Sequence, residues 1–419
     1  MFRPITALCI ACSLLAVVAK SESPTSAGNW PAWRGPQGDG TVESTDAPTK
    51  WSESEHVRWQ VAIPGRGHGS PMVFGDRVYV PTAIADPQQQ CVLCFDRQTG
   101  KPVWTAIVHE GGFANRSKRS ANEKASLASS TVTTDGQRLF INFLNDSAVR
   151  TTALSMDGDI LWQTPVSDYE LHQGYGSSPL VHGSLVLVAA DNKAGGAVVG
   201  LDRETGRIVW KHDRPKKPNY SSPVVVRIGD QDQLIMTGCD LVESLDPATG
   251  KVIWSVEGAT TECVTSTPSD GRLVFSSGGY PKNHIAAYAA DDNGSLVWEN
   301  AMRSYVPSLL LHDGHLFAVL DEGIAVCLAA ADGDVIWRKR LGGTFTSSPV
   351  LVGDRIYATD EDGKTHIYLA SADGFQRIAE NEIGTSVFAT PAISGDLIFL
   401  RFAKYVDDQR QEFLACIEN

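Results

Sequence analysis

The chain has 419 residues, a formal net charge of −13 at pH 7 and 42% hydrophobic residues. This composition is typical of a soluble globular protein. The acidic balance argues against a general nucleic-acid binder, which usually carries a basic face. No nucleic-acid partner is therefore expected.

Residues 1–19 predict an export signal. Arg3 supplies a positive start, residues 5–18 form an apolar core, and the small residue Ala19 marks the cleavage site. The apolar core is too short for a comfortable membrane span. We therefore expect a soluble periplasmic or secreted protein, cleaved near Ala19, with no membrane span.

Residues 20–50 are rich in Ser, Thr, Pro and Gly and show no strand period. They contain Trp30-Pro31-Ala32-Trp33-Arg34-Gly35-Pro36. This stretch is too aromatic for a free tail, so we expect an irregular segment packed on the body of the protein. The first clear strand follows at residues 56–63 and carries Trp59.

A repeated unit begins in the next strand. At residues 94–104 an apolar strand runs into Asp96, a short turn closes on Gly100, and a second strand ends on Trp104. The Asp side chain can cap this turn, and Gly accepts the positive φ of a tight turn. The Trp recurs at Trp59, Trp104, Trp162, Trp210, Trp254, Trp298 and Trp337, and an eighth unit has Ile378 at that position.

A second signal alternates with the first. A small hydroxyl residue before Pro opens an apolar strand at Ser70-Pro71, Ser178-Pro179, Ser222-Pro223, Thr267-Pro268, Ser348-Pro349 and Thr390-Pro391, with degenerate copies at Ser130-Thr131 and Val306-Pro307. Each unit of about 40 residues then holds four antiparallel strands, which is the signature of a β-propeller blade.

The ends of the chain predict how the ring closes. The eighth blade stops one strand short, whereas the strand with Trp59 has no opening partner. Adding that N-terminal strand to the last blade removes the exposed edges. The sequence therefore predicts an all-β fold: a single eight-bladed β-propeller of four-stranded antiparallel blades over residues 51–419.

Six cysteines follow the signal: Cys91, Cys94, Cys239, Cys263, Cys327 and Cys416. Cys91 and Cys94 lie three apart on one strand and so face opposite sides, beyond disulfide reach. We interpret them as core residues. Cys239 and Cys263 fall on loops of one face in adjacent blades. A disulfide between them and two free thiols are both compatible with the sequence.

Candidate ligand-binding residues are expected where loops meet at the mouth of the central channel. They are Arg66, His68, Tyr175, Tyr220, Arg303, Tyr305, Phe345 and Phe388. Aromatic rings there would hold a flat ligand by stacking or would simply plug the channel. Basic loop residues such as Lys124 would attract an anion, or would be solvated charges. No catalytic residue and no metal ligand is predicted, because no nucleophile–His–acid pattern or dense Ca²⁺ loop appears.

The Asp-x-x-Thr-Gly-Lys-x-x-Trp unit resembles the pyrroloquinoline quinone (PQQ) repeat. Eight-bladed quinoprotein alcohol dehydrogenases share this repeat with the propeller lipoprotein of the outer-membrane β-barrel assembly machinery. Residues 30–36 look like the start of exported bacterial PQQ-like propellers. The resemblance implies that the repeated Trp residues dock blades together and do not bind the quinone; here these are Trp104, Trp162, Trp210, Trp254, Trp298 and Trp337.

The resemblance also implies two functional classes. The dehydrogenases use adjacent cysteines and a Glu, Asn and Asp set around Ca²⁺, and this chain has no adjacent cysteine pair or matching ligand set. The assembly lipoprotein carries a lipidated Cys, for which Cys12 is a poor match. We expect a non-catalytic, cofactor-free, monomeric binding platform for an envelope protein or a small anionic ligand. The alternative is a PQQ- and Ca²⁺-dependent quinoprotein dehydrogenase that oxidises alcohols or sugars.

Overall fold

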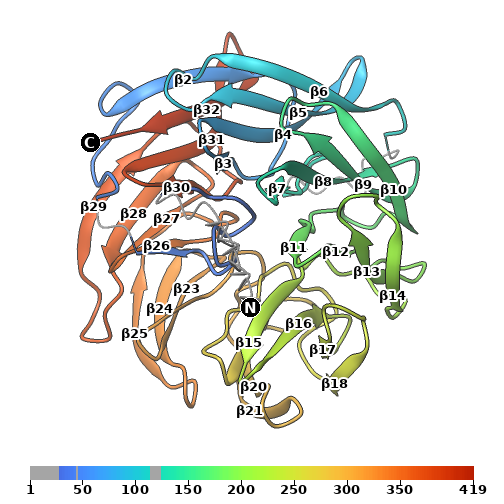
Figure 1. The fold of residues 1–419 in the computed structure, drawn as a ribbon. Coiled ribbons are helices and arrows are strands. Elements are labelled where there is room, and N and C mark those ends of the chain that lie inside the picture. Colours follow the sequence, from blue (N-terminus) through green and yellow to red (C-terminus); the bar gives the residue numbers. More distant parts are fainter. Residues whose placement is uncertain (1–27, 44–45, 114–123) are drawn as a thin grey trace, which may run out of the picture.

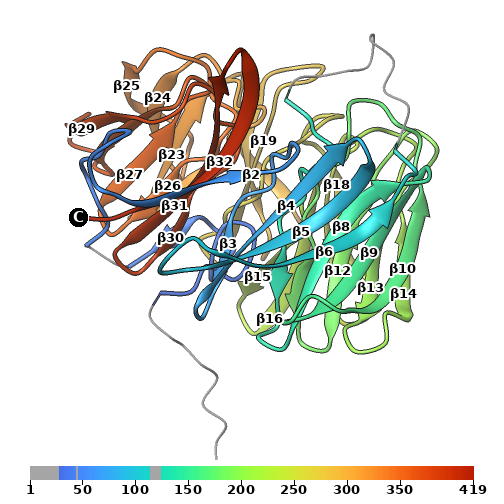
Figure 2. The same ribbon diagram turned by 90° about the horizontal axis from the view of Figure 1, so that it is seen from above.

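A computed structural model describes residues 28–43, 46–113 and 124–419. Within those ranges the regular structure consists of 32 β-strands and contains no helix. The strands form eight sheets arranged radially around a central channel (Figure 1). Figure 2 shows the same ring after a turn of 90° about the horizontal axis. The predicted eight-bladed β-propeller is confirmed.

Each blade is an antiparallel sheet with its first strand nearest the channel. Blades one to four are β3–β6, β7–β10, β11–β14 and β15–β18. Their strands are β3 Met72–Phe74, β4 Arg77–Ala85, β5 Gln88–Asp96, β6 Pro102–Glu110, β7 Thr133–Thr134, β8 Arg138–Asn145, β9 Ala148–Ser155, β10 Ile160–Asp168, β11 Leu180–His182, β12 Leu185–Ala189, β13 Ala197–Asp202, β14 Ile208–Asp213, β15 Val224–Ile228, β16 Gln231–Gly238, β17 Leu241–Leu245 and β18 Val252–Glu257.

The remaining blades follow the same plan with small variations. In the fifth blade, the innermost position is held by an isolated bridge between Ser269 and Val274, and in the seventh an extra strand, β1, is added. The strands are β19 Leu273–Gly278, β20 His284–Ala289, β21 Ser295–Asn300, β22 Leu310–His312, β23 His315–Leu320, β24 Ile324–Ala329, β25 Val335–Arg340, β1 Thr41–Val42, β26 Val350–Val352, β27 Arg355–Thr359, β28 Lys364–Leu369, β29 Arg377–Glu382, β30 Ala392–Ser394, β31 Leu397–Val406, β32 Gln409–Ile417 and β2 Val57–Ile63.

The ring closes in the way that the two ends of the sequence predicted. β2 pairs antiparallel with β32, which places Trp59 opposite Cys416. The eighth blade therefore contains β30, β31 and β32 from the C-terminus and β2 from the N-terminal side. Both edges that an open ring would expose are paired.

The repeated Asp, Gly and Trp form the joint between blades. Asp96 Oδ1 accepts hydrogen bonds from Thr99 N at 2.9 Å and Thr99 Oγ1 at 2.7 Å, which closes the turn before Gly100. A Cβ on Gly100 would lie 2.6 Å from the ring of Trp59 in the preceding blade. The same contact links Trp104 to Gly158. These turns need Gly because the neighbouring blade's Trp occupies the space of a side chain, whereas a Cβ on the corresponding Gly374 would have no atom within 4 Å.

The indole nitrogens strengthen these joints. Trp104 Nε1 donates to Met156 O at 3.1 Å, one blade further on. The corresponding bonds are Trp59 to Arg97 O, Trp162 to Arg203 O, Trp210 to Pro247 O, Trp298 to Ala330 O and Trp337 to Ser371 O. Trp254 differs, because its Nε1 donates to Gln233 Oε1 within its own blade at 3.0 Å.

The N-terminal segment, residues 28–43, crosses one end of the channel (blue in Figure 1). Trp30 pairs with Val73 in the first blade, and β1 pairs in parallel with β26 in the seventh. Between them Arg34, which is 1% exposed, donates to Leu309 O at 2.9 Å and Pro349 O at 3.0 Å. Hydrogen bonds from a charged donor contribute roughly 1.5–3 kcal/mol each. The guanidinium thus ties this segment to the sixth blade through Leu309 and reinforces its contact with the seventh through Pro349.

The six described cysteines are buried free thiols. Burial raises the pKa of Cys91 to about 11 and that of Cys94 to about 12, so both thiols stay protonated at neutral pH. Their place on β5 agrees with the interpretation as core residues. Cys239 and Cys263 are not bridged in the structure, and the disulfide stays a prediction.

Candidate functional site

A ring of hydroxyl groups surrounds the channel. In each case a backbone N–H donates to the Ser or Thr side chain that opens the next blade, at 2.9–3.1 Å. The bonds run from Ser70 to Thr131, Thr131 to Ser178, Ser178 to Ser222, Ser266 to Ser308, Ser308 to Ser348, Ser348 to Thr390 and Thr390 to Ser70. The hydroxyl before Pro is therefore a blade-to-blade contact.

The ring departs from the sequence pattern in two blades. The contributing residues are Ser266, one residue before the predicted Thr267-Pro268 step, which donates through its backbone N–H, and Ser308, after Val306-Pro307, whose hydroxyl accepts that bond. Between Ser222 and Ser266 the ring is open among the described residues. There, Ser266 Oγ accepts a hydrogen bond of 2.8 Å from Trp33 Nε1 of the N-terminal segment.

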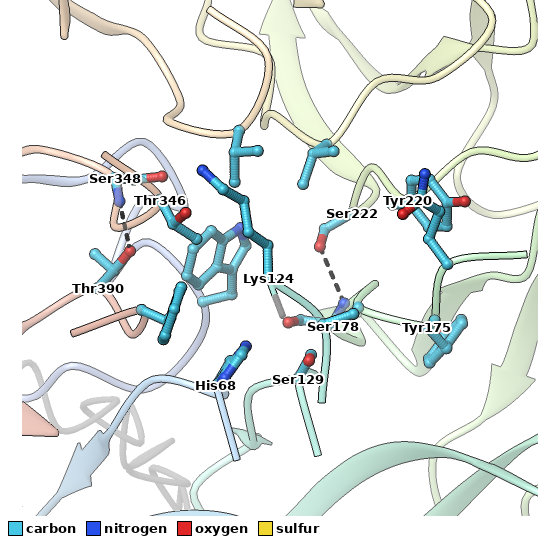
Figure 3. A pocket seen from close by; sticks show the side chains of 18 of the residues that line it. His68, Lys124, Ser129, Tyr175, Ser178, Tyr220, Ser222, Thr346, Ser348 and Thr390 are labelled. Atoms are coloured by element: carbon cyan, nitrogen blue, oxygen red, sulfur yellow. Dashed lines mark hydrogen bonds between the residues drawn. The ribbon is translucent and has the colours of Figure 1, made fainter. Parts of the chain in front are cut away.

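A cavity of about 150 Å³ lies in the channel, and Trp33 is among the residues that line it. Figure 3 shows this cavity from close by. Five of the eight candidate ligand-binding residues line it: His68, Tyr175, Tyr220, Tyr305 and Phe388. Val264 and Val306 add apolar surface, and Lys124, Ser129, Ser178, Ser222, Thr346, Ser348 and Thr390 add polar groups. Trp33, Ser178 and Ser222 also line a second cavity of about 290 Å³, so these side chains form the partition between the two.

The other three candidates lie outside the lining. Arg66 pairs through its backbone with Ala83. Arg303 donates to Gly279 O at 3.1 Å and lies 5.2 Å above the ring of Tyr305. Phe345 is 0% exposed and packs in the core of the adjoining blades. A position just before the Pro step is therefore not sufficient to place a side chain in the channel.

The basic residue at the cavity is ion-paired. Lys124 extends across the opening from the first-to-second blade connection (Figure 3), and its Nζ lies 2.6 Å from Glu361 Oε1 in the seventh blade. Thr346 Oγ1 donates to the same oxygen at 2.6 Å. The positive charge expected to attract an anion is thus largely neutralised by a protein carboxylate.

The mouth tyrosines are neutral phenols held by a buried carboxylate. Tyr305 OH donates to Glu262 Oε2 at 2.7 Å, and His172 Nδ1 lies 3.0 Å from Tyr220 OH and 3.5 Å from Glu262 Oε1. Burial raises the pKa of Tyr305 and Tyr220 well above the ordinary value, and the negative Glu262 raises both further. Both hydroxyls are thus engaged with groups of the protein.

His68 differs from the other polar side chains that line the cavity, because one of its ring nitrogens lacks a hydrogen-bond partner in the described chain. Its ring stacks on Phe388 at a centroid distance of 4.5 Å and an angle of 18°. Burial lowers its pKa well below 6.5, and the positive charges of Arg66 and Arg401 lower it further, so the imidazole is neutral at pH 7. The backbone of Lys124 is a hydrogen-bonding neighbour of the ring and opposes part of this lowering of the pKa. Within the described residues, Nδ1 of His68 is buried and has no partner that meets hydrogen-bond distance and angle.

The structure also contains a Ser–His–acid arrangement that the sequence did not indicate. Ser276 Oγ lies 2.8 Å from His284 Nε2, and His284 Nδ1 lies 2.8 Å from Glu299 Oε1. Ser276 and His284 are each 1% exposed and line none of the cavities found in the described residues. Without access to a substrate, this arrangement joins β19, β20 and β21 as a core network.

The mouth carboxylates do not fit a Ca²⁺ site. Ca²⁺ takes six to eight oxygen ligands, whereas Glu262, Glu361 and Asp321 accept hydrogen bonds from protein donors. Across the described chain, no three His, Cys, Asp or Glu side chains gather in a way that would hold a metal ion. In the same residues no helix is long and apolar enough to cross a membrane.

Comparison with known proteins gives a consistent family. The family model described as outer membrane protein assembly factor BamB matches residues 88–281 and 281–406. BamB of Yersinia pestis is 22% identical over 379 residues, covering 86% of this chain and 88% of that protein. The crystal structure of BamB from Moraxella catarrhalis superposes with a TM-score of 0.60 at 14% identity, covering 86% of this chain and 99% of that chain.

Dehydrogenases share the same fold. A structure of europium-containing methanol dehydrogenase superposes with a TM-score of 0.66 at 12% identity, covering 94% of this chain and 98% of that chain. At this identity the similarity shows the architecture alone. Because the family model spans most of the propeller, the chain belongs to the family of the outer membrane protein assembly factor BamB.

Proposed function

We propose that this protein is a non-catalytic propeller that binds other proteins in the bacterial cell envelope. The observation that carries the proposal is the match of the BamB family model over residues 88–281 and 281–406. We further propose that residues 1–19 direct export to the periplasm or the exterior, that residues 20–50 form a packed N-terminal segment, and that residues 51–419 act as one monomeric, cofactor-free propeller.

We assign protein contact to the face that carries the channel mouth. Tyr280, which is 55% exposed, follows β19 and pairs through its backbone with Glu262 behind the mouth tyrosines. Tyr405, which is 66% exposed, and Val406, which is 45% exposed, lie at the end of the β31–β32 hairpin, which projects from the ring in Figure 2. Exposed tyrosines suit a protein interface, because Tyr is enriched there relative to other surfaces.

The test is site-specific photo-crosslinking in the source bacterium. A photoreactive residue at Tyr280 or Tyr405 should give discrete adducts with a component of outer membrane protein assembly. The matched control places the photoreactive residue at Leu161, which is 50% exposed on the outer strand β10. This position should give no adduct. Deletion of the gene should also lower the amount of folded outer membrane proteins. Unchanged outer membrane proteins together with no adduct at either tyrosine would refute the proposal.

A second candidate function is a PQQ- and Ca²⁺-dependent dehydrogenase acting on alcohols or sugars. The fold similarity to methanol dehydrogenase over 94% of this chain favours it. The purified protein is incubated with PQQ and Ca²⁺ and passed through a gel-filtration column. Quinone absorbance that stays with the protein, together with dye reduction by an alcohol or sugar, would support this candidate and contradict the non-catalytic platform.

A further inference from the structure

The channel cavity has the size of a single aromatic ring. Its volume is about 150 Å³, which is close to that of an engineered apolar cavity that binds benzene. Trp33, held in place by the hydrogen bond to Ser266, lines both this cavity and the second cavity and so forms the floor between them. The floor therefore comes from outside the repeat, and it limits the depth that a ligand can reach.

The walls present ring faces and aliphatic groups. The stacked pair of His68 and Phe388 lies on one side, and Tyr220, Tyr305 and Val306 lie on other parts of the lining. The hydroxyls of Tyr305 and Tyr220 are engaged with Glu262 and His172, and the two aromatic side chains line the cavity. Offset or edge-to-face packing against such rings contributes about 0.5–1.5 kcal/mol beyond the burial of apolar area.

No charge in this lining is left for a charged ligand. Lys124 is paired with Glu361, and the mouth tyrosines and His68 are neutral at pH 7. The carboxylates of Glu262 and Asp321 accept hydrogen bonds from the hydroxyl and the backbone N–H of the lining residue Tyr305. An anion would lose its hydration and face these carboxylates, whereas a cation would compete with Lys124 for Glu361.

Among the described side chains that line the cavity, His68 carries a buried ring nitrogen without a hydrogen-bond partner. His68 is 9% exposed, and its Nδ1 lacks a hydrogen-bond partner among the described residues. Leaving a buried polar group unpaired costs about 1–3 kcal/mol. A ligand whose hydrogen-bonding group reaches Nδ1 would satisfy this atom in either imidazole tautomer.

We propose that the channel cavity binds an uncharged aromatic molecule of one ring that carries one hydrogen-bonding substituent. The proposal is independent of the protein-binding role, because the cavity lies inside the channel and the proposed partner surface lies on the exposed loops. It also departs from the small anionic ligand that the basic loops suggested, because Lys124 is neutralised by Glu361.

Three planar probes of the same size test the proposal. Benzamide is neutral and can donate or accept a hydrogen bond, benzoate is its anionic counterpart, and benzamidine is its cationic counterpart. Isothermal titration at pH 7 with the full-length mature protein should show benzamide binding with one-to-one stoichiometry. Its affinity should exceed that of either charged probe roughly tenfold or more, which corresponds to about 1.4 kcal/mol.

Variants locate the bound probe. Val306→Trp fills the cavity and should abolish benzamide binding, and Val264→Phe on another part of the lining gives a second test if the first variant does not fold. Val335→Trp is the matched control, since Val335 is 42% exposed on the outer strand β25, and it should bind as the wild type does. His68→Phe should weaken benzamide roughly tenfold while leaving toluene binding unchanged, because toluene makes no hydrogen bond.

Several results would overturn the proposal. These are the absence of saturable benzamide binding, benzoate or benzamidine binding as tightly as benzamide, or unchanged binding in a folded Val306→Trp variant. Displacement of benzamide by PQQ would also overturn it, because PQQ is a three-ring tricarboxylate. None of these results depends on whether the exposed tyrosines contact a protein partner, so failure of one proposal leaves the other intact.

Discussion

The joint between blades makes a quantitative prediction for Gly158→Ala. Gly158 has a φ of +92°, and a Cβ there would lie 2.9 Å from the ring of Trp104 in the preceding blade. The left-handed backbone costs a non-glycine residue about 1–2 kcal/mol. Overpacking against a ring that is fixed by its hydrogen bond to Met156 adds about 1–3 kcal/mol. The free energy of unfolding should therefore fall by about 2–5 kcal/mol.

Gly271→Ala separates the two contributions. Gly271 has a nearly equal φ of +88°, and the nearest atom to its Cβ would be Arg227 O at 3.7 Å, an ordinary van der Waals contact. This variant should lose only the backbone contribution, about 1–2 kcal/mol. The difference between the two variants measures the collision with Trp104 alone.

The assay is equilibrium unfolding in urea, followed by far-UV circular dichroism and tryptophan fluorescence. A double-mutant cycle with Trp104→Ala completes it: in that background, Gly158→Ala should cost no more than Gly271→Ala does, because the obstructing ring is gone. Equal destabilisation by Gly158→Ala and Gly271→Ala in the wild-type background would refute the argument that the repeat conserves space for the neighbouring Trp.

Three further predictions follow. Trp33→Phe keeps the aromatic floor but removes the donor to Ser266 Oγ, so the free energy of unfolding should fall by about 0.5–1.5 kcal/mol in urea titrations, and no change would argue against that hydrogen bond. For Glu243, burial raises the pKa, but the hydrogen bond from His212 and the charge of Arg214 outweigh it and lower the pKa to about 2. The stabilisation that ionised Glu243 contributes should be complete above pH 4.5, the ordinary pKa of the group, and should be lost as the pH falls toward 2. The urea midpoint of Glu243→Gln should therefore change less between pH 5 and pH 3 than that of the wild type, and parallel curves would contradict this. Thiol titration of the purified protein without reductant should find all six described cysteines unreactive when folded and reactive in denaturant, whereas a count lower by two would indicate a bridge between Cys239 and Cys263.

The repeat was predictable because its information is local. Asp96, Thr99 and Gly100 build one turn from adjacent residues, and Trp104 follows on the next strand. Eight such units, with one strand missing at the C-terminus, are sufficient to predict the ring and its closure by β2. The same local signal misplaced two contacts, because the fifth blade uses Ser266 where the sequence pattern indicated Thr267, and the sixth uses Ser308 where it indicated Val306.

The site was only partly predictable, because its defining contacts join residues far apart in the chain. Trp33 bonds to Ser266 across 233 positions, and Lys124 pairs with Glu361 across 237. The aromatic character of residues 30–36 signalled that they pack, but nothing local says that Trp33 enters the channel. The Ser276, His284 and Glu299 network was missed for a similar reason, since its members meet only through the pairing of three strands.

The position of Trp33 suggests how this fold separates stability from binding. A ring of equivalent blades would close the channel with equivalent hydroxyl bonds, and here the described ring is open only between Ser222 and Ser266. Trp33, which is not part of any blade, takes the free hydroxyl and forms the floor of the cavity. The joints at Trp104 and its counterparts are remote from that cavity. Substitutions at the joints should therefore lower the free energy of unfolding while sparing benzamide affinity, and substitutions at Val306 should do the reverse.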